Sequence, residues 1–369
     1  MFKNLFKNKE IELAEKVVKD NPDNIIKLNI LGKLYVENNF FNEAINVFEK
    51  ILKIDENYLP ALESLSKCYL LKKEYLKAFR TLKFLYSKNT NDSHIKTLLF
   101  SLKKAPCDIE AKIEILKGLL EYDNSNELQE KLAEKYYESG QFIKSANIYE
   151  NLLGIEENTT YLKSLYEIYE KIGKYSHAAI ALERLMLTDE FDNFFAEKLA
   201  NIYFKVKRFE ESKGIYELLI QSNPQKSKFY NEELAKISLA QNNPEEALIA
   251  TQNVINEDSF SIDAKFLQAQ ALIENENYEE AIAFLREFYC DPIDEKTEKK
   301  IINEIIKTCI LFSQKLRKER NFAKAIDSLT PALRYDDTNK DIYIELSKIS
   351  EDIKDFSAAK EYMKIAESL

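Results

Sequence analysis

The chain of 369 residues has no tryptophan, two histidines, four cysteines, six glycines and seven prolines. So few turn-forming residues exclude a turn-rich all-β protein of this length. No cysteine belongs to a C-x-x-C pair, which excludes the usual zinc-ligand spacing and favours reduced thiols in the cytoplasm. No apolar run approaches the 18 residues that a membrane-spanning helix needs. The opening residues, Met1-Phe2-Lys3-Asn4-Leu5-Phe6-Lys7, reach charges too soon to contain the apolar region of a secretory signal.

What the chain has is helix-forming sequence. Hydrophobic residues make up 45% and charged residues 31%, which is enough apolar material for an ordered core. The net charge of −10 argues against nucleic acid as a partner. The charge is uneven, because residues 1–105 hold 19 Lys and Arg against 13 Asp and Glu, and the remainder holds 34 against 50. Such asymmetry can orient a protein toward an acidic partner or an anionic surface.

A pattern that returns about every 34 residues organises the chain. In the unit starting at 25, Leu28, Leu31 and Gly32 are followed by Tyr35 and then by Ala44. Steps of three and four place such residues on one face of a helix. A small residue early in the second helix allows two helices to approach closely, and a larger one there costs about 1–3 kcal/mol. This small residue recurs as Ala44, Ala78, Ser145, Ala178, Ser212, Ala247, Ala281, Ala325 and Ala359.

These spacings, Leu-x2-Leu-[Gly/Ala/Ser]-x2-Tyr followed by Ala-x3-aromatic, resemble tetratricopeptide repeats over 25–92 and 126–369. The tryptophan common in such repeats is absent. The resemblance implies an all-α, right-handed superhelical solenoid of antiparallel helix pairs, with about nine repeats plus an N-terminal helix. It also implies a protein-interaction scaffold or adaptor, which we expect to be bacterial and cytoplasmic.

The spacing of the repeats predicts five parts. They are an N-terminal capping helix (1–24), two repeats (25–92), a degenerate repeat (93–125), five repeats (126–295) and two C-terminal repeats with an elongated first helix (296–369). We also expect the last helix to leave an apolar edge, a candidate surface for self-association.

Catalytic motifs are missing from this organisation. The glycines never cluster into a phosphate-binding loop, and no serine lies in a Gly-x-Ser-x-Gly turn. Carboxylates occur at every spacing, so pairs of them carry no signal for acid–base chemistry. We therefore expect no enzymatic activity, no cofactor and no metal.

In tetratricopeptide repeats the concave groove is lined by positions 2, 5, 9, 12 and 13 of each repeat. Carried over to this sequence, these positions include carboxylates such as Glu130, Glu134 and Glu167. Exposed aromatic rings make strong anchors for a bound segment, and Phe204 is the strongest candidate. We expect a partner protein or peptide segment to contact Lys33, Lys67, Tyr137, Lys163, Phe194, Asn201, Phe204, Phe229, Lys236, Phe266 and Gln270.

A basic stripe is a second candidate surface. We expect it to occupy the outer face of the helix that carries Ala78, where it would contact an acidic protein or anionic lipid. Two alternatives to an adaptor therefore remain open: an assembly factor that docks on a membrane surface through its basic N-terminal third, and a regulatory subunit of an enzyme complex. The stripe consists of Lys72, Lys73, Lys77, Arg80 and Lys83.

Overall fold

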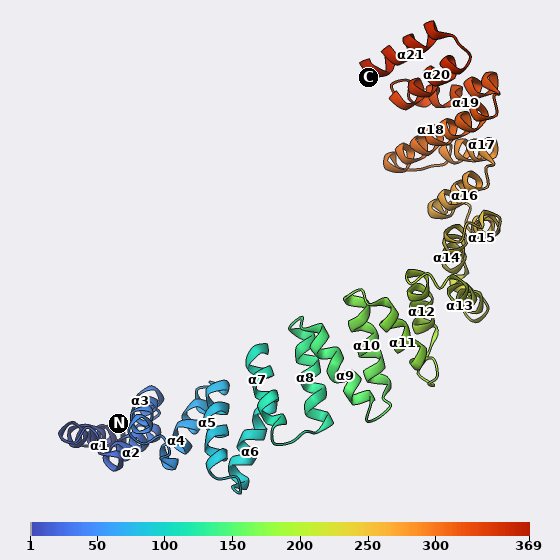
Figure 1. The fold of residues 1–369 in the computed structure, drawn as a ribbon. Helices are drawn as coiled ribbons and strands as arrows, with labels where there is room; N and C mark the ends of the chain where they lie inside the picture. Colours follow the sequence, from blue (N-terminus) through green and yellow to red (C-terminus); the bar gives the residue numbers. More distant parts are fainter. Residues whose placement is uncertain (1) are drawn as a thin grey trace. The chain divides into compact units, whose positions relative to one another are not determined.

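Helices follow one another along the chain in the computed structural model, which describes residues 2–369 and side chains from residue 9 onward (Figure 1). Within residues 2–369 there are 21 α-helices, two short 3-10 helices and no strand. The α-helices are α1 (Phe2–Asp20), α2 (Ile25–Glu37), α3 (Phe41–Ile54), α4 (Leu59–Leu71), α5 (Tyr75–Lys88), α6 (Ser93–Ser101), α7 (Ile109–Leu120), α8 (Asn126–Glu138), α9 (Phe142–Leu153), α10 (Thr159–Lys171), α11 (Tyr175–Leu185), α12 (Asn193–Lys205), α13 (Phe209–Ser222), α14 (Ser227–Ala240), α15 (Pro244–Glu257), α16 (Ile262–Glu274), α17 (Tyr278–Tyr289), α18 (Glu295–Lys318), α19 (Phe322–Tyr335), α20 (Lys340–Asp352) and α21 (Phe356–Ser368).

The helices form two compact units, one up to Leu185 and one from Met186. In the first unit α1 packs on α2, and the helix pairs α2–α3, α4–α5, α8–α9 and α10–α11 stack in sequence order. In the second unit the pairs are α12–α13, α14–α15, α16–α17, α18–α19 and α20–α21. The predicted all-α solenoid of helix pairs is confirmed.

The two helices of a pair touch where both carry a small residue. In four pairs one of these residues is serine and the other is alanine, and the serine hydroxyl donates to the alanine carbonyl. Each bond is buried and contributes about 1 kcal/mol, while the absence of larger side chains sets the close spacing. The bonds are Ser145 to Ala133 (2.7 Å), Ser212 to Ala200 (2.7 Å), Ser313 to Ala325 (3.0 Å) and Ser347 to Ala359 (2.9 Å).

The turn inside each pair is closed by backbone alone. The residue after the turn donates its N–H to a carbonyl five positions earlier, as Glu74 does to Tyr69 at 2.9 Å. This bond requires a residue with positive φ just before it, a conformation that glycine adopts without steric cost. Only two of the nine such residues are glycine. The nine are Asn39, Lys73, Gly140, Gly173, Lys207, Asn242, Glu276, Arg320 and Lys354, with φ between 57° and 76°.

Neighbouring pairs in the first unit are joined by a recurring polar contact. The tyrosine near the end of a first helix donates its hydroxyl to a glutamate on the preceding second helix: Tyr35 to Glu15 at 2.5 Å and Tyr69 to Glu49 at 2.7 Å. Tyr169 bonds Glu150 in the same way. Because Glu15 lies on α1, this helix occupies the place of a second helix before the first complete pair.

The segment expected to be degenerate, 93–125, departs from the paired arrangement. Its first helix, α6, has only nine residues and ends in a 3-10 turn (Leu102–Lys104) ahead of Pro106. The second helix, α7, packs on both α5 and α8. Lys112 fills the gap after the short helix by donating to the carbonyl of Lys103 at 3.2 Å and to that of Ala105. The local core stays continuous, with Leu99 and Leu116 fully buried.

The last repeats contain the longest helix of the described residues, α18, with 24 residues. Near its end Arg317 donates to Glu345 of α20 at 2.7 Å and to Asp352 at 3.0 Å. Glu345 is 1% exposed, so this arginine supplies a partner to a carboxylate that has almost no contact with solvent.

Helix α21 carries the expected apolar C-terminal edge only in part. Ala359 and Ala366 are buried against the preceding helices, whereas Tyr362, Met363 and Ile365 are half-buried. Its exposed positions include Phe356 but are otherwise largely charged, because the helical period turns polar residues outward. They include Lys360, Glu361, Lys364 and Glu367.

A pair of lysine substitutions tests the cost of the positive-φ turn. Lys354 has φ of 66°, and replacing it by glycine removes about 1–2 kcal/mol of strain, less the backbone entropy that glycine loses on folding. We expect Lys354→Gly to raise the free energy of unfolding by up to about 1 kcal/mol in urea titrations. The control Lys348→Gly, at an exposed site within α20, should lower it by about 1 kcal/mol. The same sign for both substitutions would contradict the strain.

Candidate functional site

A pocket of about 390 Å³ opens between the first helices α8 and α10. Glu130, Glu134 and Tyr137 reach it from α8, on successive turns of one helix face. Glu167 and Ile168 reach it from α10. The structure thus brings together four residues at sequence-predicted groove positions. The remaining lining residues are Glu138, Tyr149, Thr160 and Ser164.

Negative charge dominates this pocket. Glu138 pairs with Lys135 at 2.5 Å. In the part of the chain whose side chains are described, Glu130, Glu134 and Glu167 form no ion pair or side-chain hydrogen bond. Glu130 is half-buried and Glu134 and Glu167 are exposed, so their negative charge attracts a cation but is partly screened by salt.

The base of the pocket is apolar and aromatic. Ile168 is fully buried and Tyr149 is 5% exposed. Burial raises the pKa of the Tyr149 phenol to about 12, and the neighbouring carboxylates of Glu134 and Glu130 add to this rise. The negative charge of the pocket carboxylates therefore accounts for part of the raised pKa of this buried phenol.

The rim of the pocket carries the predicted anchor Tyr137. Its ring is half-buried and packs edge-on against Phe142, with 5.4 Å between centroids. The Lys171 ammonium lies 4.8 Å from the centre of the Tyr137 ring and 4.9 Å from that of Phe142. An aromatic surface at this edge thus already holds a cation of the chain itself.

The predicted phenylalanines of the second unit divide into two kinds. Phe204 is half-buried against Phe209, at 5.7 Å between ring centroids. Phe266 packs on Phe288 at 5.2 Å. Phe194 and Phe229, at the starts of α12 and α14, are 55% and 42% exposed.

Phe204 packs as Tyr137 does, half-buried against the aromatic residue five positions later, so its preference as an anchor stays a prediction.

The predicted polar residues lie on the first helices, and several have partners. Lys67 pairs with Glu63 at 2.8 Å and Lys236 with Glu233 at 2.6 Å. Gln270 donates to Glu274 at 2.9 Å. Those with an exposed side chain are Lys33, Lys67, Lys236 and Gln270, and those half-buried are Lys163 and Asn201.

The predicted basic stripe does not lie on one helix. Because α5 begins at Tyr75, Lys72 and Lys73 belong to the preceding turn, where Lys73 has φ of 60°. Lys72 and Lys77 both pair with Glu74, at 2.8 and 2.9 Å. Helical spacing applied across this turn was the error, and the pairing leaves the stripe little free positive charge.

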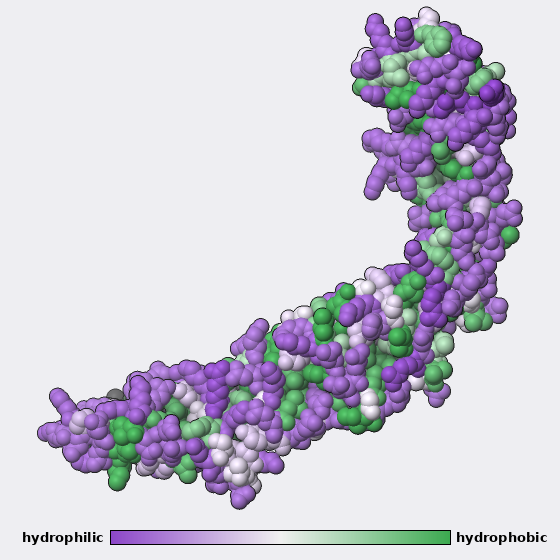
Figure 2. Space-filling model, in the orientation of Figure 1, coloured by the Kyte–Doolittle hydropathy of each residue, from purple (hydrophilic) through white to green (hydrophobic). Residues whose placement is uncertain are grey.

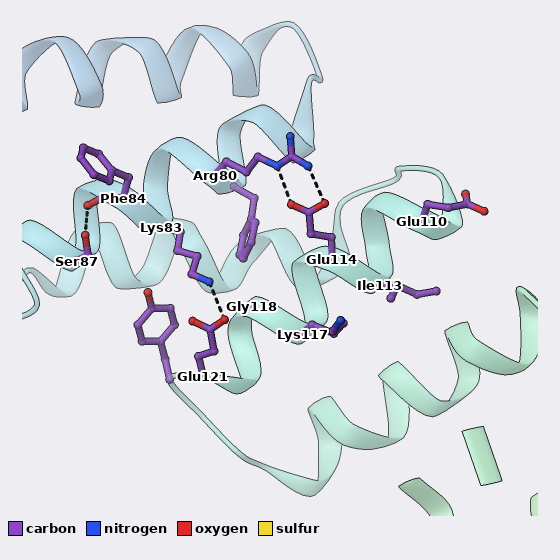
Figure 3. A pocket seen from close by; sticks show the side chains of 12 residues that line it. Arg80, Lys83, Phe84, Ser87, Glu110, Ile113, Glu114, Lys117, Gly118 and Glu121 are labelled. Atoms are coloured by element: carbon purple, nitrogen blue, oxygen red, sulfur yellow. Dashed lines mark hydrogen bonds and ion pairs between the residues drawn. The ribbon is translucent and has the colours of Figure 1, made fainter. Parts of the chain in front are cut away.

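The remaining residues of the stripe, Arg80 and Lys83, border a second pocket of about 630 Å³ between α5 and α7 (Figure 3). Arg80 forms a two-pronged contact with Glu114, at 2.7 and 2.8 Å, and Lys83 pairs with Glu121 at 2.7 Å (Figure 3). Gly118 lies against the Phe79 ring, and a Cβ there would come within 2.5 Å of it. This pocket was not predicted from the sequence, where the glycine at an otherwise apolar helix position was its only signal.

Metal and membrane features are limited in the described part of the chain. No group of three or more His, Cys, Asp and Glu side chains there could hold a metal ion. None of the described helices has the length and apolar character to cross a bilayer. Exposed apolar side chains occur as small areas within a mostly hydrophilic surface in the view of Figure 2. Cys68 and Cys309 are buried, and burial raises the pKa of each thiol to about 11.

The raised pKa of Tyr149 predicts a loss of stability in alkali. The folded protein holds this proton up to about pH 12, whereas an unfolded tyrosine releases it near pH 10. The contribution of Tyr149 to the free energy of unfolding is therefore fully present below pH 10. It falls by up to about 1.4 kcal/mol per pH unit as the pH rises to 12. We expect Tyr149→Phe to remove this slope from the free energy of unfolding, measured by urea titration from pH 9 to 12. An unchanged slope in the variant would contradict the prediction.

Comparison with known proteins gives two family matches. Residues 28–58 and residues 232–295 each match a tetratricopeptide repeat model. A search of curated proteins finds no match. Similar solved structures include Naa15/Naa10 bound to HypK-THB (17% identity, TM-score 0.43, covering 100% of this chain and 62% of that one). The MamA protein (17%, 0.38, 44% and 88%) and yeast Tom70 (13%, 0.31, 100% and 89%) are also similar.

The chain thus spans about three fifths of the chain matched in the Naa15/Naa10 structure. The two family matches fall in different units, and the pairs in both units share the same turn and the same small-residue contact. Repeats of this kind form protein-interaction scaffolds. Both units therefore contain tetratricopeptide-repeat sequence.

Proposed function

We propose that this protein binds an extended segment of a partner protein along the face formed by the first helices of its repeats. The observation that carries the proposal is the pocket between α8 and α10, which combines an apolar base with unpaired carboxylates on that face. A peptide laid across first helices meets side chains at regular intervals, so one segment can occupy several sites at once.

Aromatic rings on the same helices, exposed or half-buried, support this proposal. Phe194 and Phe229 begin two successive first helices of the second unit, and Tyr137 lies at the rim of the pocket in the first. Aromatic side chains bury 150–250 Å² each with few rotatable bonds, which makes them effective anchors. Anchors in the two units would bind different portions of a partner.

The alternative of docking on an anionic membrane loses its main support. It required a stripe of free cations on α5, and Lys77, Arg80 and Lys83 are each paired with a glutamate. Surface pairs of this kind leave little net field to attract lipid headgroups. A regulatory subunit of an enzyme complex would bind its enzyme through the same first-helix face by which an adaptor binds its partner.

Substitution of the exposed anchors tests the proposal. We expect the triple variant Tyr137→Ala, Phe194→Ala, Phe229→Ala to recover specific partners at least tenfold less well than the wild type. The measurement is an affinity-tagged pull-down from the native cell, quantified by mass spectrometry. We expect a tenfold loss of recovery because exposed aromatic side chains often contribute much of the binding energy of an interface.

A matched triple variant controls for the loss of exposed aromatic area. Phe40, Phe84 and Phe356 are also exposed and lie outside the first helices. Their replacement by alanine should leave recovery unchanged, with helicity of both variants checked by circular dichroism. Equal recovery by the two variants would show that the first-helix face is not the binding surface.

A further inference from the structure

We infer that the pocket between α8 and α10 receives the cationic side chain of a lysine or arginine in the bound segment. This inference rests on the proposed function and specifies the chemistry of the partner at one site. It differs from a general attraction of positive charge, because it places the cation among three particular carboxylates.

The first argument is the pairing of carboxylates around the pocket. On α8, Glu127 contacts both Lys103 and Lys131, and Glu138 contacts Lys135. The three carboxylates that line the pocket and lack a partner come from both of its sides. Glu130 and Glu134 are one turn apart on α8, and Glu167 projects from α10. A cation entering between the helices would therefore approach all three.

The second argument is the ammonium that already lies at the rim. Lys171 contacts the faces of Tyr137 and Phe142 and, within the described residues, forms no ion pair with a pocket carboxylate. Its position shows that the edge of the pocket accommodates a lysine head group against an aromatic ring. A lysine or arginine of a partner could use the same ring and extend further, to the carboxylates.

The shape and lining of the pocket favour a long side chain over a bare ion. The base of Tyr149 and Ile168 is apolar, which suits the methylene stem of lysine or arginine. The pKa of Tyr149 is raised in part by Glu134 and Glu130, which agrees with a negatively charged site. Within the described residues no acidic cluster is close enough to hold a metal ion, so a multivalent metal is the poorer fit.

Defined peptides test the inference on the full chain. A random 12-residue peptide library displayed on phage is selected against the wild type, and the recovered peptides are measured by fluorescence polarisation at 150 mM salt. We expect them to share a lysine or arginine, and its replacement by norleucine to weaken binding at least tenfold. The variant Glu130→Gln, Glu134→Gln, Glu167→Gln should weaken the parent peptides by a similar factor, yet bind the norleucine peptides as the wild type does.

A control variant that loses the same number of carboxylates distinguishes binding in the pocket from long-range attraction by the negative charge of the protein. Glu12, Glu43 and Glu56 are exposed carboxylates of the same unit that lie outside the first helices. Their triple replacement by glutamine should change binding less than twofold. Equal weakening by the two glutamine variants would overturn the inference, because long-range attraction would then explain the preference for cations.

Failure of the inference is distinguishable from failure of the proposed function. If peptides bind, are lost in the Tyr137, Phe194 and Phe229 variant, and ignore the pocket carboxylates, the inference is wrong and the proposed function stands. If the selected peptides bind the aromatic variant and the pocket variant as well as the wild type, both are wrong.

Discussion

The close contact between two helices of a pair is the constraint on which the fold depends. It needs a small side chain on each helix at the crossing, and in four pairs an alanine carbonyl there also accepts a serine hydroxyl. Ser145 and Ser347 fulfil this role from opposite helices of their pairs, since one lies on a second helix and the other on a first. The crossing thus fixes the pair, while the outward positions remain free to vary. The binding chemistry can differ between repeats because those positions do not support the fold.

The periodicity of small and apolar residues was sufficient to predict the pairs, because it reflects this crossing directly. The acidic pocket could be predicted only in part. Glu130, Glu134 and Glu167 fall at groove positions, but which carboxylates are already paired depends on neighbouring helices. Glu127 shows the difference, because it lies on the same helix and is neutralised by Lys103 from the degenerate segment. Sequence spacing places a side chain on a face but does not identify its partner.

One error of prediction arises at the turn between the helices of a pair. The basic stripe assumed continuous helix through Lys73, where the backbone in fact turns through a left-handed conformation. A lysine or glutamate at the left-handed position gives no sequence signal there, whereas Gly140 and Gly173 do.

The range of the contacts along the chain has a consequence for how the protein folds. The ion pair between Lys315 and Glu276 spans 39 residues, and the serine–carbonyl bonds span 12. Tertiary contacts of this kind connect a helix to its partner or to the adjacent pair. Because ordering one pair closes only a short loop, the entropy cost of the first native contacts is small wherever along the chain they form. Folding can therefore begin at any of several pairs and spread to their neighbours, so a pair completed early during synthesis already offers a surface for the next.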